Sequence, residues 1–410
     1  MNDLLYWIWL SEKVTPDTPI FSILYHTFGS AEKIYSASKN ELKQALNLKP
    51  AQIEALCDKS MDSAEKILKK CRLNNIGILP YNDELFPSRL RTIKNPPVLL
   101  YYKGKLPIFD NEVCIGTVGT RNPSTYGCRI AYEVAFDLAL SGAYVISGMA
   151  FGIDSVCHKA ALDAGGKTIA VLGCGVDVVY PKENSELYSR IEKNGALISE
   201  YAPGFKATRY TFPQRNRIIS GLSLGTLIIE AQIKSGAMIT AKIAKEQNRD
   251  LFAIPGRLGE YNSVGPNALI QCGAQSVTSA NDILSEYEFL YPEKIRIQQK
   301  QIPKKNPYAN SNNILISSYL KKQPAKEIKI TQTIFEETVE KTAEDILAQY
   351  PNLSEEQRKI CLCLSKNIPK SLEEIAKNIN ISVSDIMSSL TILEIQGIVN
   401  AVPGGNFVLA

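Results

Sequence analysis

One turn in the sequence combines residue types that bind anions. The apolar run 113–118 is an expected strand, and Gly119, Thr120 and Arg121 follow it. Ser124 then precedes an expected helix. A turn between the carboxyl end of a strand and a helix presents free backbone N–H groups and the positive end of the helix dipole. Glycine lets the backbone approach a ligand, hydroxyl groups add hydrogen-bond donors, and arginine adds a planar charged fork. The turn therefore predicts a phosphate site.

Two further turns are placed in the same way relative to expected strands. Gly148 lies in the turn 147–154, and a glycine-containing turn occupies residues 173–177. Loops at the carboxyl ends of strands gather at one edge of a doubly wound sheet. Ser235 and Gly236 open another helix and form a second possible anion cradle.

The segment 210–217 gathers aromatic and basic side chains. Tyr210 and Phe212 precede Arg215, Asn216 and Arg217. Aromatic rings that stack on bases, next to arginines that contact the backbone, are typical of single-stranded nucleic-acid binding. The alternative is a packed helix N-terminus in which the arginines pair with Glu230 or Asp154. Both can hold if one arginine is structural and the other lies at the surface.

Few side chains in the sequence suit catalysis, metals or cofactors. Asp154 and His158 would share one face of a helix, but no nucleophile accompanies them, so we expect a structural hydrogen bond. The chain has two histidines and nine cysteines without a CxxC pair, which disfavours a metal site. Gly116 and Gly119 do not have the GxGxxG spacing, which disfavours NAD. We expect no catalytic residue, metal or cofactor.

The elements that position these residues alternate along residues 112–285. Short apolar runs end in glycine-rich or polar turns and give way to helical stretches, which predicts βαβ units. The runs are apolar throughout, which indicates a sheet buried on both faces. The predicted fold is therefore α/β, an extended Rossmann-like, doubly wound parallel sheet. The composition, 45% hydrophobic and 21% charged, excludes a disordered protein, and the net charge of +4 permits nucleic-acid binding without indicating it.

The chain is expected to contain four segments, with boundaries at residues 1–85, 86–290, 291–350 and 351–410. The first is helical, either a SAM-like or helix-hairpin-helix module or a cap on the next domain. The second is the Rossmann-like domain. The third is a charged linker, basic and then acidic, which either contacts nucleic acid or is a solvated tether. The fourth has the order of a winged helix, but its third helix lacks Arg and Lys, which favours protein interaction or weak DNA binding.

Together, these segments resemble the DNA-processing protein A family (DprA/Smf). The resemblance covers about residues 80 to 285. It rests on collinear motifs, which read VGTRNPSTYG, SGMAFGIDSVCHKAAL, VLGCGVDVVYPKEN, SEYAPG, FPQRNRIISGLS, SGAMITA and FAIPGR. Thr120 stands where the family usually has Ser, and Cys157 where it usually has Ala. Neither difference removes the anion-binding chemistry.

The resemblance implies a cytoplasmic, dimeric protein without catalytic turnover. It would bind single-stranded DNA, protect incoming strands in natural transformation and help load the RecA recombinase in DNA recombination. No membrane segment is expected, because the longest apolar opening run is far shorter than a membrane span. The residues predicted to bind DNA or phosphate are Gly119, Thr120, Arg121, Ser124, Gly148, Phe212, Arg215, Asn216, Arg217, Ser235 and Gly236.

An enzymatic function is the competing hypothesis. Gly225, Thr226 and Glu230 resemble the GT…E element of phosphoribohydrolases on a related fold. The residues before them, 222–224, lack the Pro-Gly-Gly that holds the ribose phosphate in those enzymes. A sequence-specific regulator that acts through the winged helix is a weaker alternative, because its third helix carries no basic side chain.

Overall fold

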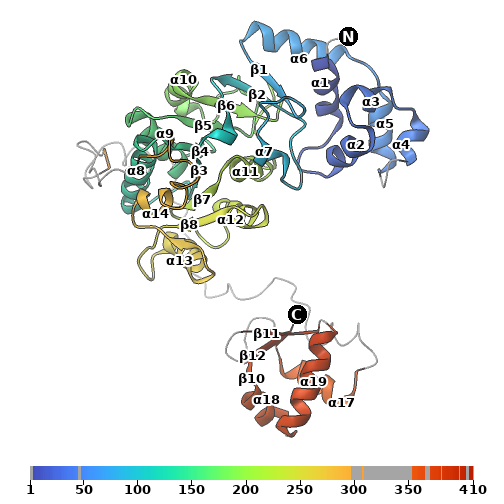
Figure 1. Cartoon of the computed structure of the whole chain (residues 1–410), viewed down its shortest axis with the longest axis vertical. Helices are drawn as coiled ribbons and strands as arrows, with labels where there is room; N and C mark the ends of the chain where they lie inside the picture. Colours follow the sequence, from blue (N-terminus) through green and yellow to red (C-terminus); the bar gives the residue numbers. More distant parts are fainter. Residues whose placement is uncertain are drawn as a thin grey trace, which may run out of the picture. The chain divides into compact units, whose positions relative to one another are not determined.

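The computed structural model describes residues 3–44, 48–296, 307–308, 353–364, 370–379, 381–396, 398–402 and 406–409. The chain forms two compact units, Met1–Pro324 and Ala325–Ala410 (Figure 1). The predicted linker, residues 291–350, lies outside the described residues except for 291–296 and 307–308. Among the described helices, none has the length and apolar character needed to cross a membrane.

A single mostly parallel sheet organises the first unit. Its strands lie in the order β1-β2-β6-β5-β4-β3-β7-β8-β9, and the pairs from β6 through to β9 are all parallel. The bounds are β1 Gly77–Pro80, β2 Leu99–Gly104, β3 Cys114–Val118, β4 Tyr144–Ser147, β5 Thr168–Val171, β6 Ala196–Ser199, β7 Gly225–Ile228, β8 Asp250–Ala253 and β9 Gln275–Ser276. The predicted doubly wound sheet is confirmed.

Helices cover both faces of this sheet. The principal ones are α8 Thr125–Leu140, α9 Ile153–Asp163, α10 Ser185–Asn194, α11 Thr211–Leu222, α12 Gly236–Glu246, α13 Val264–Gln271 and α14 Ala280–Leu284, with a short α7 Ser88–Arg91. One core cluster joins α8, α9 and α14 to the sheet, and another joins α11 and α12 to it. Burial on both faces explains why the strands are apolar throughout rather than alternating.

Two strands extend the sheet beyond the parallel part. β1 pairs antiparallel with β2, and β2 pairs antiparallel with β6. The sequence pattern predicts only helices up to residue 85, and β1 departs from that prediction. Gly77 pairs with Tyr102, and the tyrosine ring lies where a side chain of residue 77 would be, 2.1 Å from its Cβ position. The residues around Gly77 do not by themselves predict a strand, because the ring that packs on this glycine comes from Tyr102, far along the sequence.

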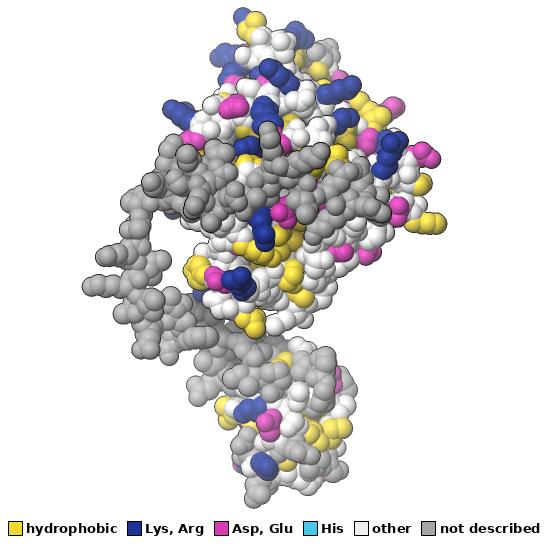
Figure 2. All heavy atoms as spheres, turned by 90° about the vertical axis from the view of Figure 1, so that its left-hand side faces the viewer, with side chains coloured by type: hydrophobic (Ala, Val, Ile, Leu, Met, Phe, Trp, Pro, Cys, Tyr) yellow, Lys and Arg dark blue, Asp and Glu magenta, His cyan; other side chains and the backbone are white. Residues whose placement is uncertain are grey.

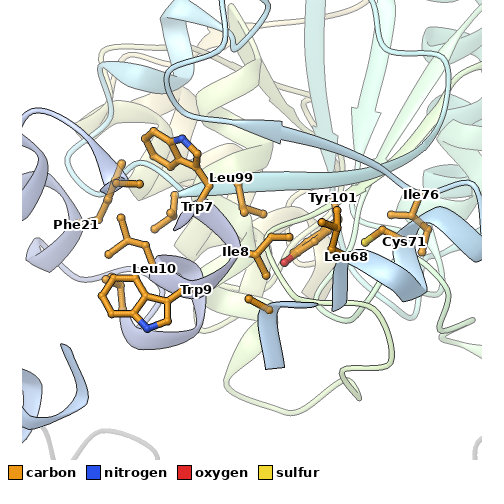
Figure 3. Close-up of a cluster of buried hydrophobic side chains, with 14 of the residues drawn as sticks. Trp7, Ile8, Trp9, Leu10, Phe21, Leu68, Cys71, Ile76, Leu99 and Tyr101 are labelled. Atoms are coloured by element: carbon orange, nitrogen blue, oxygen red, sulfur yellow. The ribbon is translucent and has the colours of Figure 1, made fainter. Parts of the chain in front are cut away.

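The amino-terminal helices share a core with the sheet. They are α1 Asp3–Lys13, α2 Ile20–Phe28, α3 Ala31–Ser36, α4 Lys39–Gln44, α5 Pro50–Cys57 and α6 Asp62–Leu73. Figure 3 shows Ile8 of α1 and Leu68 of α6 beside Tyr101 of β2. Trp7 and Trp9 are buried in the same cluster. This burial holds the helices against the sheet through apolar contact.

The second unit is a winged helix. It contains α17 Glu355–Cys363, α18 Leu372–Ile379 and α19 Val383–Ile395, with a small antiparallel sheet of β10 Lys370–Ser371, β12 Asn406–Leu409 and β11 Val399–Val402. Ile360, Ile375 and Leu390 are among the side chains of its core. The predicted order of helices followed by a hairpin is confirmed. The predicted turn at 403–405 lies outside the described residues.

Candidate nucleic-acid interface

Gly119 and Thr120 are committed to contacts within the chain. A Cβ atom on Gly119 would lie 2.6 Å from Cγ1 of Ile153, so glycine is required here for the packing of α9. The Thr120 backbone N–H donates to the Glu230 carbonyl at 2.7 Å, and its hydroxyl accepts from the Asn122 backbone N–H at 3.2 Å. These contacts show that both residues shape the turn.

Glu230 places a carboxylate at the start of α8. This carboxylate accepts from the Ser124 backbone N–H at 2.9 Å, from the Ser124 hydroxyl at 2.5 Å and from the Asn262 amide at 3.4 Å. Gly127 gives it room, because a Cβ there would lie 2.3 Å from the carboxylate. The chain's own anion therefore occupies the helix N-terminus that the sequence analysis assigned to a phosphate. The position of Ser124 supports a capping role.

Arg121, Tyr180 and Phe212 line one pocket at the carboxyl ends of β3, β4 and β5, here called the Arg121 pocket. Arg121 is exposed, and its Cζ atom lies 5.3 Å from the centre of the Phe212 ring. The Tyr180 and Phe212 ring centres are 5.5 Å apart, and Tyr180 is 47% exposed. Gly148 and Gly173 also line the pocket. It combines an accessible cation with two aromatic rings.

Arg215 lies beneath this pocket rather than in it. Its side chain is buried and donates from Nη1 to the Gly148 carbonyl at 2.5 Å and to the Val171 carbonyl. Asp154 accepts from the backbone N–H groups of Gly148, at 3.1 Å, and Ala150, at 3.3 Å. Burial raises the pKa of Asp154, and the nearby charge of Arg215 opposes that rise. Together the two side chains hold the Gly148 loop in place.

Arg217 is also buried and has acidic partners. Its Nη2 lies 2.5 Å from a carboxylate oxygen of Glu200, and its Nε lies 3.4 Å from Oδ1 of Asp17, in the loop between α1 and α2. The Arg217 and Glu200 side chains are each 5% exposed. This position indicates a structural role for Arg217 and does not support the predicted DNA contact. The actual partners differ from Glu230 and Asp154, which the sequence analysis considered.

Asn216, Ser235 and Gly236 form a separate group. The Asn216 amide donates to the Gly236 carbonyl at 3.5 Å. Ser235 caps α12 by accepting from the Met238 backbone N–H at 3.5 Å. Neither Ser235 nor Gly236 is among the residues that line the Arg121 pocket. The structure therefore brings Arg121, Gly148 and Phe212 together, while these three predicted residues lie elsewhere.

His158 and Asp154 have different partners. His158 is fully buried, and its Nδ1 lies 2.6 Å from the Thr168 hydroxyl. That hydroxyl donates its only proton to the Val145 carbonyl, so its oxygen must accept from His158. The neutral imidazole therefore carries its proton on Nδ1. Burial lowers the pKa of His158 to about 3. Asp154 binds the backbone of its own loop, which is the structural arrangement favoured from the sequence.

Sequence reasoning missed part of the surface around the pocket. Tyr180 follows a turn after β5 and carries no spacing signal that would pair it with Phe212. Lys206 and Arg209 are exposed in the loop before α11, and Arg209 lies over Tyr210, with 4.7 Å from Cζ to the ring centre. Tyr210 is 64% exposed. Basic residues next to aromatic ones in GFKATRY were the available signal. In the described residues, no group of three or more His, Cys, Asp or Glu could hold a metal.

Comparison with known proteins identifies similar chains. A family model described as DNA recombination-mediator protein A matches residues 77–288. The chain is 36% identical over 274 residues to "DNA processing protein DprA" of Bacillus subtilis (strain 168), an alignment that covers 67% of this chain and 87% of the relative.

Two solved structures are also similar. The X-ray structure of DNA processing protein A from Streptococcus pneumoniae has a TM-score of 0.61 and 33% identity, with 73% of this chain and 99% of that chain covered. A structure of DNA processing protein A from Helicobacter pylori, described as giving its single-stranded DNA binding mode, has a TM-score of 0.48 and 31% identity. That alignment covers 53% of this chain and 97% of the other.

Proposed function

Because the chain belongs to the DNA recombination-mediator protein A family, we propose that it is a DNA-processing protein that binds single-stranded DNA at the Arg121 pocket. The observation that carries this proposal is the position of the Arg121 guanidinium, which is exposed and 5.3 Å from the centre of the Phe212 ring. An arginine can pair with a backbone phosphate, while a neighbouring ring stacks on a base.

The pocket suits a single strand better than a duplex. A base can reach Phe212 or Tyr180 only when it is unstacked from its neighbours, as bases in a single strand can be. Stacking on an aromatic ring tolerates every base, so binding is expected to have little sequence preference. The exposed Lys206, Arg209 and Tyr210 continue the same chemistry along the loop before α11.

The cellular part of the proposal follows from the family. We propose that the protein protects incoming single strands in natural transformation and helps load the RecA recombinase onto them. We further propose that it is cytoplasmic and acts as a homodimer, without a cofactor or catalytic turnover. The two groups nearest to a catalytic pair have structural partners, which supports the last point: Asp154 binds the backbone of its own loop, and His158 is bound to Thr168 in the core.

A binding titration tests the proposal. Single-stranded and duplex oligonucleotides are titrated with the full chain at two salt concentrations, with and without Mg²⁺, and strand loading is followed after addition of RecA. We expect tighter binding to single strands, affinity that falls steeply with salt, and no need for the metal. Equal affinity for both forms, or affinity that is indifferent to salt, would overturn the proposal.

The enzymatic alternative finds no support in the geometry of Glu230. In the phosphoribohydrolase-like reading this carboxylate would face a substrate, but here it is bound to Ser124 and Asn262 and is 3% exposed. Incubation with nucleoside monophosphates tests that reading directly. Release of a free base would establish the enzyme, and we expect none.

A further inference from the structure

We propose that helix α6 extends the single-strand path beyond the Arg121 pocket, as a basic surface for the continuing sugar-phosphate backbone. This inference rests on the proposed function and adds a second contact region to it. Four basic side chains lie in the last two turns of α6, namely Lys66, Lys69, Lys70 and Arg72. Its two acidic side chains, Asp62 and Glu65, lie in the first turn.

The basic side chains are separate from the face of α6 that packs on the core. Ala64, Leu68 and Cys71 are buried, whereas Lys66, Lys69 and Arg72 are exposed. None of these three forms a salt bridge to another described residue. In Figure 2, Lys and Arg side chains gather at the upper end of the molecule, the level at which Figure 1 shows α6.

Lys70 fixes α6 to the loop that leads to the pocket. Its Nζ lies 2.8 Å from Oδ2 of Asp177, and Oδ1 of Asp177 accepts from the Gly204 backbone N–H at 2.6 Å. Gly204 has φ +88°, and a Cβ there would lie 2.5 Å from Nζ of Lys70. The three groups therefore form one contact between the carboxyl-end turn of β5, the loop before α11 and α6.

This contact holds α6 against the loop whose continuation along the chain reaches the pocket. From Gly204 the chain runs through the exposed Lys206 and Arg209 to Phe212 and so to Arg121. In the other direction, Lys66 lies one turn from Lys70 on the same side of α6. A row of cations with aromatic rings at one end matches a polyanion whose bases are unstacked at that end. The occupant is therefore the same DNA strand, beyond the nucleotides held at the pocket.

The alternative is that these basic side chains only stabilise α6. Basic residues in the last turns of a helix stabilise it by interaction with the helix dipole, whether or not a ligand is present. The two readings differ in their dependence on DNA length. Only a binding surface predicts that the lysines matter for long strands and not for short ones.

The test measures affinity for a series of oligothymidylates of increasing length by fluorescence anisotropy. The variant is Lys66→Ala/Lys69→Ala in the full chain, since alanine preserves the helix. The matched control is Lys39→Ala/Lys43→Ala on α4, which removes the same charge from the same module on the side away from the sheet (Figure 1). Melting temperature checks that both variants fold, and Lys66→Gln/Lys69→Gln repeats the test with longer side chains.

We expect the α6 variant to bind short strands like the wild type and to bind long strands roughly tenfold more weakly, with a salt slope lower by about 1.4. The control should match the wild type at every length. The proposal is overturned if the α6 variant binds all lengths normally, if it weakens all lengths equally, or if the control behaves in the same way. Arg121→Ala, measured on the shortest strand that binds, separates this result from failure of the proposed function. If that variant also binds normally, the pocket itself is misassigned.

Discussion

Arg121 and Arg217 lie in two motifs with similar chemistry, yet the fold uses them differently. Arg121 is exposed beside Phe212, whereas Arg217 is buried against Glu200 and Asp17. Exposure leaves Arg121 available for a ligand. Burial makes Arg217 part of the packing between α11 and the amino-terminal helices.

Replacing Arg121 is expected to affect binding and not folding. Arg121→Ala should weaken single-strand binding almost equally for every sequence and lower the salt slope by about 0.7, because one phosphate contact on a single strand is lost. The melting temperature should hardly change, since an exposed arginine contributes little to stability. Titration and thermal melting of the same sample measure both.

Arg217→Ala is the contrasting control. It leaves the Glu200 carboxylate buried without its partner, which costs about 3 kcal/mol or more in unfolding free energy. Its DNA affinity per folded molecule should remain normal. A stable Arg217 variant with weak binding would show that this arginine contacts DNA and that the site has been drawn too narrowly.

Glu230 provides a second residue-scale prediction. Glu230→Ala removes the anion at the start of α8 and leaves the Ser124 N–H and hydroxyl without it. Low concentrations of sulfate should then raise the melting temperature of the variant and not that of the wild type, because sulfate can occupy the vacated helix N-terminus. Chloride at equal ionic strength is the control. An equal response of both proteins to sulfate would refute the assignment.

His158 predicts a loss of stability in acid. Burial, followed by the charge of Arg215, lowers the pKa of His158 from 6.5 to about 3. Below pH 6.5 the unfolded chain gains a proton that the folded chain does not, so stability is lost between pH 6.5 and 3 and is unaffected above that range. The slope is about 1.4 kcal/mol per pH unit.

Chemical denaturation at pH 7 and pH 5 measures this effect. The wild type should lose about 2 kcal/mol more than His158→Gln over that interval. His26→Gln changes the exposed histidine and should lose as much as the wild type. Identical losses in the wild type and His158→Gln would mean that His158 is protonated in the folded state.

At the scale of elements, α19 has the position of a DNA-reading helix but not the basic side chains of one. It occupies the third-helix position of a winged helix, but its sequence VSDIMSSLTILEI carries no Lys or Arg. Lys and Arg side chains give phosphate binding its dependence on charge, and Arg121, Lys206 and Arg209 of the proposed binding site all lie in the first unit.

Removal of residues 351–410 should therefore leave single-strand affinity within about twofold of the full chain, since no phosphate contact is lost. The same anisotropy titration measures it on long and short strands. If most of the affinity disappears with the tail, the winged helix belongs to the primary binding site.

The sequence predicts elements better than it predicts partners. The run 113–118 and its turn could be identified because strand, glycine and helix follow one another locally. β1 could not, because it depends on the ring of Tyr102 covering Gly77. The partners of Arg217 were equally hidden, although a structural role was one of the alternatives, since no spacing rule links it to Asp17 and Glu200. Glu230 was visible as an acid but not as the occupant of a distant helix N-terminus.

At the scale of the whole molecule, the predicted first boundary at residue 85 remains a proposal. β1 precedes that boundary yet belongs to the sheet, and Leu68 and Ile8 pack against Tyr101 beyond it. Apolar contact of this kind makes neighbouring elements unfold together. The amino-terminal helices therefore share a hydrophobic core with the sheet whose strand ends form the Arg121 pocket.

The shared core has a consequence during synthesis on the ribosome. The two tryptophans of α1 are made before Leu99, Tyr101 and Leu197, which belong to the same cluster. Until those residues are made, the apolar faces of the helices are exposed on the nascent chain and prone to aggregation. Contacts between residues so far apart in sequence also form slowly. The amino-terminal helices can complete their packing only after β6 has left the exit tunnel. Until then, the apolar face of α1 is open to chaperones that shield such segments.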